Sequence, residues 1–289
     1  MEIIKILTWE RKNGRTHGTV GSSIIRGDWL IKHWDEASLW SEGAKSDVMI
    51  FEKVYWEEMM DAYPGIKILD LVDPDFLTGA LELVKISQKV DAITCSSKGL
   101  YDYVKKVVKC PVKHIPDRLD LEFFNYKKEH SGKATNVVWF GYHNNAKDVL
   151  PMILPTLGSL DLSLTVVSNQ DYVNLNSCGV EIINKQFNWD TIKFDLTYGD
   201  IVLNPQPIER NKRFIYKSEN KTWIAWACGM PVANTLEELE LFLDPDQRKI
   251  EVEEKLKFIK EECDIKKSVK DFKNLIKLCQ ENRKKSQSK

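Results

Sequence analysis

The chain has 289 residues, of which 43% are hydrophobic and 29% charged, and its formal net charge is −1. This length exceeds that of a typical single domain, so we expect two domains. The near-zero net charge argues against a protein held to nucleic acid by bulk positive charge, and the absence of a long apolar run argues against a membrane-spanning helix.

The first part of the chain alternates between apolar strand patterns and helix patterns. We expect strands at residues 2–8, 46–51, 67–72, 91–95 and 112–115, and helices at 24–34, 54–62, 78–90 and 96–108. A polar, glycine-rich loop fills residues 9–23. Strands that alternate with helices over this length predict a parallel sheet covered on both faces.

A polar stretch at 126–135, YKKEHSGKAT, predicts an interdomain linker, after which the alternation restarts. We expect strands at 136–140, 163–167, 180–183, 201–203 and 231–233, with helices at 148–160, 188–194 and 222–228. The predicted fold class is therefore α/β, with two Rossmann-like domains that face a cleft and with charged C-terminal helices. The predicted boundaries are 1–125, 126–135, 136–235 and 236–289.

The six cysteines and the N-terminus indicate where the protein works. None of the cysteines forms a CxxC pair, and no histidine stands at metal-ligand spacing from them, so we expect free thiols in a reducing compartment. The first residues break into charge too soon for a signal peptide. We therefore expect a cytoplasmic protein without a transmembrane segment.

The loop after the first strand, NGRTHGTVGSS, is the first candidate site. Gly18 and Gly21 allow the backbone to approach a ligand closely, although the loop matches neither GxGxxG nor the Walker A pattern. His17 lies between these glycines and the strand, and its ordinary pKa suits base chemistry. The alternative is a flexible surface loop with a solvent-facing histidine.

Two further loops follow predicted strand ends. In DLVDPD, the pattern favours Asp73 as a helix N-cap over a role in metal binding or as a base. In GYHNN, the backbone around Gly141, His143 and Asn144 can cradle a phosphate, whereas the alternative is a simple asparagine-rich turn.

The segment 200–232 contains a strand, a basic loop and a helix that opens on KSENK. A helix N-terminus carries partial positive charge and unpaired N–H groups, so with nearby lysines it can seat a phosphate. We expect Lys217, Ser218, Asn220 and Lys221 to form that seat. For residues 210–213 a solvated charged face is the alternative.

Three segments in order resemble the GT-B glycosyltransferases of the sucrose-synthase-like group, also called glycosyl transferases group 1. They are DAITCSSKGLYDYVKKVVKCPVKHIPDRLDLEFF at 91–124, VVWFG at 137–141, and the stretch from Asp200. The resemblance implies a hexosyltransferase type of enzyme that moves a sugar from a nucleotide diphosphate sugar to an acceptor hydroxyl. The nucleotide sugar is a co-substrate, and no cofactor or metal is implied.

The same resemblance implies roles for the candidate residues. The diphosphate or ribose would meet Lys217, Ser218, Asn220 and Lys221. The loops around Gly18, Gly21, Gly141, His143 and Asn144 would border the donor, and His17 would act at the reacting centre. The acceptor, whether a glycan, a small molecule or a modified DNA base, would lie mainly against the N-terminal domain.

One departure from the group leaves alternatives open. Many relatives carry two glutamates seven residues apart, but the corresponding positions here hold Tyr216 and Ile224, and Glu219 is out of register. The alternatives are a DNA-base glycosyltransferase of viral type and a non-catalytic nucleotide-binding protein of the same fold.

Overall fold

The computed structural model describes residues 3–16, 18–174, 178–209 and 211–287, which form two compact units, each built on one parallel sheet. Unit 1 comprises Met1–Asp120, Lys212–Glu219 and Asp264–Lys289, and unit 2 comprises Leu121–Asn211 and Asn220–Cys263. Within the described ranges, every helix is too short or too polar to cross a bilayer.

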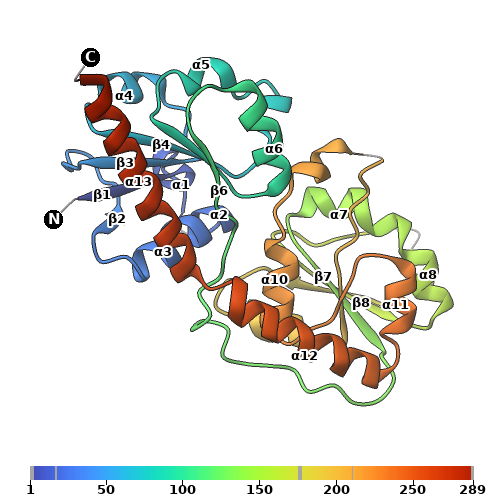
Figure 1. Cartoon of the computed structure of the whole chain (residues 1–289). Helices are drawn as coiled ribbons and strands as arrows, with labels where there is room; N and C mark the ends of the chain where they lie inside the picture. The colour runs from blue at the N-terminus through green and yellow to red at the C-terminus, as the bar shows by residue number, and fades with distance from the viewer. Residues whose placement is uncertain (1–2, 17, 175–177, 210, 288–289) are drawn as a thin grey trace. The chain divides into compact units, whose positions relative to one another are not determined.

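Unit 1 contains a six-stranded sheet in the order β2-β1-β3-β4-β5-β6, in which all pairs are parallel (Figure 1). Its elements before the linker are β1 (Ile4–Thr8), α1 (Trp9–Lys12), α2 (Gly21–Ser23), the π-helix η1 (Ile24–Asp28), α3 (Trp29–Lys32), β2 (Ala37–Leu39), β3 (Val48–Glu52), α4 (Glu57–Ala62), β4 (Ile66–Leu71), η2 (Asp75–Leu77), α5 (Leu83–Ser87), β5 (Ala92–Cys95), α6 (Lys98–Val107) and β6 (Val112–His114). It also contains η4 (Lys212–Tyr216) and α13 (Ile265–Gln287).

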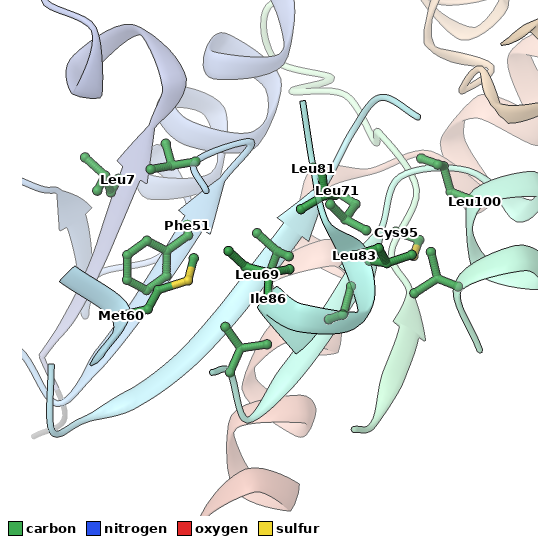
Figure 2. Close-up of a cluster of buried hydrophobic side chains, with 14 of the residues drawn as sticks. Leu7, Phe51, Met60, Leu69, Leu71, Leu81, Leu83, Ile86, Cys95 and Leu100 are labelled. Carbon is green, nitrogen blue, oxygen red and sulfur yellow. The ribbon is translucent and has the colours of Figure 1, made fainter. Parts of the chain in front are cut away.

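The core of unit 1 follows from the alternation of side chains along its strands. Figure 2 shows one cluster, in which Leu7, Phe51 and Leu69 from neighbouring strands pack against Met60 of α4 and Ile86 of α5. Helices α3 and α13 also contact one another, and α13 contacts β4. Because β3 and β5 are buried along their whole length, their sequences, VMIFE and AITC, are mostly apolar and do not alternate.

The structure departs from the sequence prediction in three places in unit 1. Residues 9–12, expected in a loop, form the short helix α1, whose start is capped by Thr8. Residues 37–39 form an unpredicted edge strand. The helix expected at 78–90 is limited to Leu83–Ser87, because Gly79 adopts a φ of +75° and ends the preceding 3-10 turn.

Unit 2 contains a five-stranded parallel sheet in the order β11-β10-β7-β8-β9. Its elements are β7 (Asn136–Phe140), α7 (His143–Val149), η3 (Leu150–Met152), α8 (Leu154–Ser159), β8 (Ser163–Ser168), β9 (Ile182–Gln186), α9 (Ile192–Thr197), β10 (Ile201–Leu203), α10 (Asn220–Ala227), β11 (Val232–Ala233), α11 (Leu236–Leu241) and α12 (Pro245–Glu262). Helix α10 packs on α12 (Figure 1).

The predicted fold class is confirmed in its main features: two parallel α/β sheets with helices, followed by long C-terminal helices. The two long helices belong to different units, α12 to unit 2 and α13 to unit 1. The segment predicted as a linker runs along unit 2, where the amide of Lys128 donates to the carbonyl of Cys228 and the amide of Ala134 donates to the carbonyl of Leu243.

Candidate functional site

The carboxyl ends of β7 and β10 form the topological switch point of the unit 2 sheet, since the chain proceeds from β7 to β8 on one side and places β10 on the other. Ligands of open α/β sheets bind in the crevice beyond such a point. Gly141 follows β7 directly, and its amide donates to the carbonyl of Val167 at 3.0 Å. The predicted GYHNN loop therefore lies where the fold favours a ligand.

Lys221, in the first turn of α10, lies beside this strand end. Its Nζ is 4.8 Å from the ring centroid of Trp139 and 5.8 Å from that of Phe140. A Cβ built on Gly141 would come within 2.3 Å of that Nζ and would displace the flexible Lys221 side chain, and the φ of Gly141, +150°, is one that residues other than glycine rarely adopt. The structure thus brings Gly141 and Lys221 together, as the phosphate-seat hypothesis requires.

The other predicted residues of unit 2 lie close by in the chain. The amide of His143, at the start of α7, donates to Oδ1 of Asn169 at 2.9 Å, and its Nδ1 is buried with no hydrogen-bond partner among the described residues. Asn144 is exposed. Asn220 is the first residue of α10. In the same turn, the hydroxyl of Thr222 accepts a hydrogen bond from the side-chain amide of Asn204, which directly follows β10.

Lys217 and Ser218, by contrast, belong to unit 1. The Nζ of Lys217 is 2.7 Å from Oδ1 of Asp73, whose other oxygen lies 2.6 Å from Nζ of Lys53. Burial alone would raise the pKa of the Asp73 carboxyl, but Lys217 and Lys53 together hold it well below its usual range. The sequence prediction that Asp73 caps a helix is wrong: η2 begins at Asp75 without a side-chain cap, and the Asp73 carboxylate binds the two lysines.

Three further contacts hold residues 212–219 on unit 1. Ser97 donates a hydrogen bond to the carbonyl of Tyr216 at 2.8 Å, and the Tyr216 ring packs edge-on against Phe76 and Tyr103. Gly99 has no room for a Cβ, which would come within 2.0 Å of the carbonyl oxygen of Ile215. We call residues 212–219 the KRFIYKSE segment.

The two positions where relatives carry glutamate are occupied by packed side chains. Tyr216 is held in the aromatic cluster of unit 1, and Ile224 is 3% exposed in the interior of unit 2. Neither side chain offers a carboxylate, and the structure places no other acid in their stead within α10.

A buried charge network lies under the carboxyl edge of the unit 1 sheet, and the sequence reasoning missed it. The guanidinium of Arg26 binds Asp70 through Nε and Nη2, both at 2.6 Å, and binds Asp117 through Nη1 at 3.0 Å. All three side chains are almost fully buried. Burial would lower the pKa of Arg26, but Asp70 and Asp117 raise it above its usual value.

Ser218 is a neighbour of this network, since its side chain lowers the pKa of Asp117, which burial nevertheless keeps above the usual range. Arg26 lies in the π-helix η1, a kind of turn found at functional or specially packed sites, but no local sequence pattern indicates it. The network fixes η1, β4 and the segment after β6 to one another.

Glu10 holds the glycine loop of unit 1 in place through hydrogen bonds. The sequence did not predict this role. The Glu10 carboxylate is 1% exposed and accepts hydrogen bonds from the amides of Gly18 and Val20 and from the hydroxyl of Thr19. The backbone amides that could otherwise donate hydrogen bonds to a phosphate therefore donate to the Glu10 carboxylate. Gly21 begins α2, and the predicted catalytic residue His17 lies outside the described residues.

Glu52, at the carboxyl end of β3, lies beside the same loop. Its Oε2 accepts from the amide of Trp9 at 3.0 Å and from the hydroxyl of Ser23 at 3.2 Å, while Oε1 is buried without a hydrogen-bond partner among the described residues. Burial raises the pKa of the Glu52 carboxyl to about 7. Glu52 thus titrates near neutral pH behind the predicted site loop.

One hollow of unit 2 lies away from these residues. It has a volume of about 240 Å³ and lies at the carboxyl ends of β10 and β11, against Leu203, Pro205 and Leu239. None of the predicted site residues lines it, and no titratable side chain does. We therefore place the candidate chemistry at Gly141 and Lys221, where charge and the switch point coincide.

No family model matches the chain, and no curated protein matches it. Solved structures do. An alpha-glucosyltransferase in complex with UDP and a 13-mer DNA matches with a TM-score of 0.66 and 13% identity, over 96% of this chain and 100% of that one. HepE of Anabaena, in complex with UDP-glucose, matches with a TM-score of 0.61 and 10% identity, over 96% and 100%.

TarM of S. aureus matches with a TM-score of 0.61 and 11% identity, over 79% of this chain and 54% of TarM, so the chain spans about half the length of that protein. At these identities the matches show the fold. The GT-B fold predicted from the three sequence segments is confirmed.

Proposed function

We propose that the protein is a glycosyltransferase that moves a hexose from a nucleotide diphosphate sugar to an acceptor hydroxyl without a metal ion. The observation that carries the proposal is the position of Lys221, whose ammonium group lies beside Gly141 in the first turn of α10 at the switch point of unit 2. In this proposal Lys221, the α10 N-terminus and the Gly141 loop stabilise the departing diphosphate.

The remaining residues take supporting roles in the proposal. Asn220, His143 and Asn144 border the donor within unit 2. Gly18 and Gly21 also border the donor, and His17 acts at the reacting centre. Lys217 and Ser218 are engaged by acids of unit 1. We therefore assign them to holding the KRFIYKSE segment in place rather than to direct phosphate contact.

Titration of UDP, GDP and UDP-glucose, followed by calorimetry and thermal shift, tests the donor site. UDP-glucose is the first donor to try, because it is bound by HepE, which has the same fold. At least one nucleotide should bind and raise the melting temperature. If none of these nucleotides binds and turnover of UDP-glucose is absent, the proposal is wrong.

A second candidate is a nucleotide-binding protein of this fold without turnover. It is favoured by the packed Tyr216 and Ile224 at the positions of the glutamate pair. Nucleotide binding without hydrolysis or transfer of UDP-glucose to water or to any acceptor would support this second candidate over the first.

A further inference from the structure

Unit 1 has a groove at the carboxyl edge of its sheet, over the ends of three adjacent strands. The groove has a volume of about 450 Å³. Arg11 and Lys12 reach it from α1, directly after β1, while Trp40 follows β2 and Trp56 precedes α4. This is the edge of an open parallel sheet at which ligands bind.

Two tryptophans form the walls of the groove, and both are firmly placed. Each is half-buried and packs against the core cluster of unit 1. The amide of Trp40 donates to the carbonyl of Ile6 at 2.9 Å, and the carbonyl of Trp56 accepts the first hydrogen bond of α4 from Met60 at 3.0 Å. Rigid, partly exposed indole rings offer flat apolar surface at little entropic cost.

Four charged side chains accompany the rings: Arg11, Lys12, Glu42 and Glu58. All four are exposed, and among the described residues Glu42 and Glu58 form neither an ion pair nor a side-chain hydrogen bond. Lys12 lies 4.0 Å from the centroid of the Trp56 ring, and Arg11 donates to the carbonyl of Trp40 at 3.4 Å. The groove therefore presents carboxylate acceptors and cationic donors around two aromatic faces.

We propose that this groove binds a neutral sugar unit of the acceptor. A sugar ring has C–H faces that pack on indole rings and hydroxyl edges that both donate and accept hydrogen bonds, and the groove matches both properties. Its two acids balance its two bases. A nucleic acid backbone would instead require an excess of positive charge.

The inference rests on the proposed transferase function, to which it adds a substrate class: the acceptor is a saccharide. The residues of the groove act in binding, and the proposal gives them no part in bond breaking.

Titration with the neutral disaccharides maltose, cellobiose, lactose and chitobiose, followed by tryptophan fluorescence and calorimetry, tests the proposal. At least one should bind with a Kd in the millimolar range. The substitutions Trp40→Ala and Trp56→Ala should each weaken that binding about tenfold or more, because aromatic residues dominate such contacts. Glu58→Gln should weaken it by a smaller factor.

Matched variants keep the test decisive. Glu57 neighbours Glu58 on α4 but pairs with Lys85 and Lys89 away from the groove, so Glu57→Gln should leave the disaccharide affinity unchanged. If Trp40→Ala does not fold, Trp40→Phe and Glu42→Gln still probe the same surface. Absence of binding by every disaccharide, or binding that none of the groove substitutions alters, overturns the proposal.

A single-stranded oligodeoxynucleotide serves as the competing probe. If it binds in a salt-dependent manner and loses affinity in the Trp40 and Trp56 variants while the disaccharides do not bind, the groove stacks nucleobases and the saccharide proposal is wrong. Disaccharide binding needs no donor. Disaccharide binding in the groove without any UDP binding would therefore contradict the transferase proposal but not the groove proposal. UDP binding without disaccharide binding would contradict only the groove proposal.

Discussion

The ammonium group of Lys217 lies 2.7 Å from the carboxylate of Asp73, within unit 1. Lys221, four residues later, lies beside Gly141 in unit 2. The two lysines of the KSENK motif therefore lie in different units: Lys217 pairs with Asp73 in unit 1, and Lys221 lies at the switch point of unit 2. Only three residues separate the two lysines in the chain.

The role of the Asp73–Lys217 pair can be tested by the direction in which two substitutions change the affinity for UDP. If the pair holds the KRFIYKSE segment in the position that nucleotide binding requires, Asp73→Asn and Lys217→Met should each weaken UDP binding about threefold to tenfold, and the double variant should be no worse than either single one. If Lys217 instead contacts phosphate, Asp73→Asn should strengthen binding by removing a competing negative charge. Amide hydrogen exchange across 212–219 should also accelerate in Asp73→Asn without any ligand.

Lys221 is predicted to carry the donor affinity of unit 2. The substitution Lys221→Ala removes a charge-assisted contact to the diphosphate worth about 1.5–3 kcal/mol, so UDP affinity measured by calorimetry should fall about tenfold to a hundredfold. Lys147→Ala, which removes an exposed lysine of α7, is the control and should bind UDP like the parent. Unchanged affinity in Lys221→Ala would place the anion elsewhere.

Gly141→Ala should reproduce the loss seen with Lys221→Ala. The added methyl group would stand 2.3 Å from the Lys221 ammonium, and the φ of +150° is unfavourable for alanine. Because the methyl group displaces Lys221 from the strand end, the double variant Gly141→Ala/Lys221→Ala should lose little more UDP affinity than either single variant. Full additivity in a double-mutant cycle would show that the two residues act independently.

Much of the fold could be predicted from the sequence because most of its strands are buried and mostly apolar. The strands at 48–52, 66–71 and 136–140 stand close to their predicted positions. Strand 37–39 was missed because its three residues are only half-buried at the sheet edge and make no apolar run. The helix expected at 78–90 was too long because an apolar pattern does not show that Gly79 adopts a left-handed conformation.

The candidate site was located by the rule that loops after parallel strands bear ligands, and the rule led to Gly141 and Lys221. Local sequence could not show that Lys217 pairs with Asp73, 144 residues away. Nor could it show that Arg26 meets Asp70 and Asp117, or that Glu10 holds the glycine loop. Such partners are set by tertiary packing, which places distant side chains together and leaves no local periodicity.

The glycine loop should depend on Glu10. In Glu10→Gln the side chain loses its charge and one acceptor oxygen, and its new amide hydrogens face the N–H groups of residues 18–20. We expect faster amide exchange in this loop and a lower kcat with donor KM nearly unchanged, the same pattern expected for His17→Ala if His17 acts in the transition state. Glu36→Gln, a surface change elsewhere on unit 1, is the control. A Glu10→Gln protein with parental kcat and parental exchange would show that the loop is positioned by other contacts.

Glu52 should make stability depend on pH in the range between its unfolded and folded pKa values. Its folded pKa is raised by burial to about 7, against 4.5 for a solvent-exposed glutamate such as that of the unfolded chain, so the native state holds its proton more tightly than the unfolded state. The stabilising contribution is fully present below pH 4.5 and is lost as the pH rises through 7, amounting to roughly 3 kcal/mol in the free energy of unfolding. Other titrating groups add their own dependence, so a comparison between variants isolates this one.

Glu52→Gln mimics the protonated form and should remove that part of the pH dependence. Urea unfolding at pH 5 and at pH 8 should show the variant gaining stability relative to the parent as the pH rises. Glu58→Gln, which changes an exposed glutamate, should leave the parental pH dependence intact. If Glu52→Gln and the parent lose stability in parallel between pH 5 and pH 8, the Glu52 carboxyl is ionised in the native protein throughout, and its unpartnered Oε1 must then find a compensating charge.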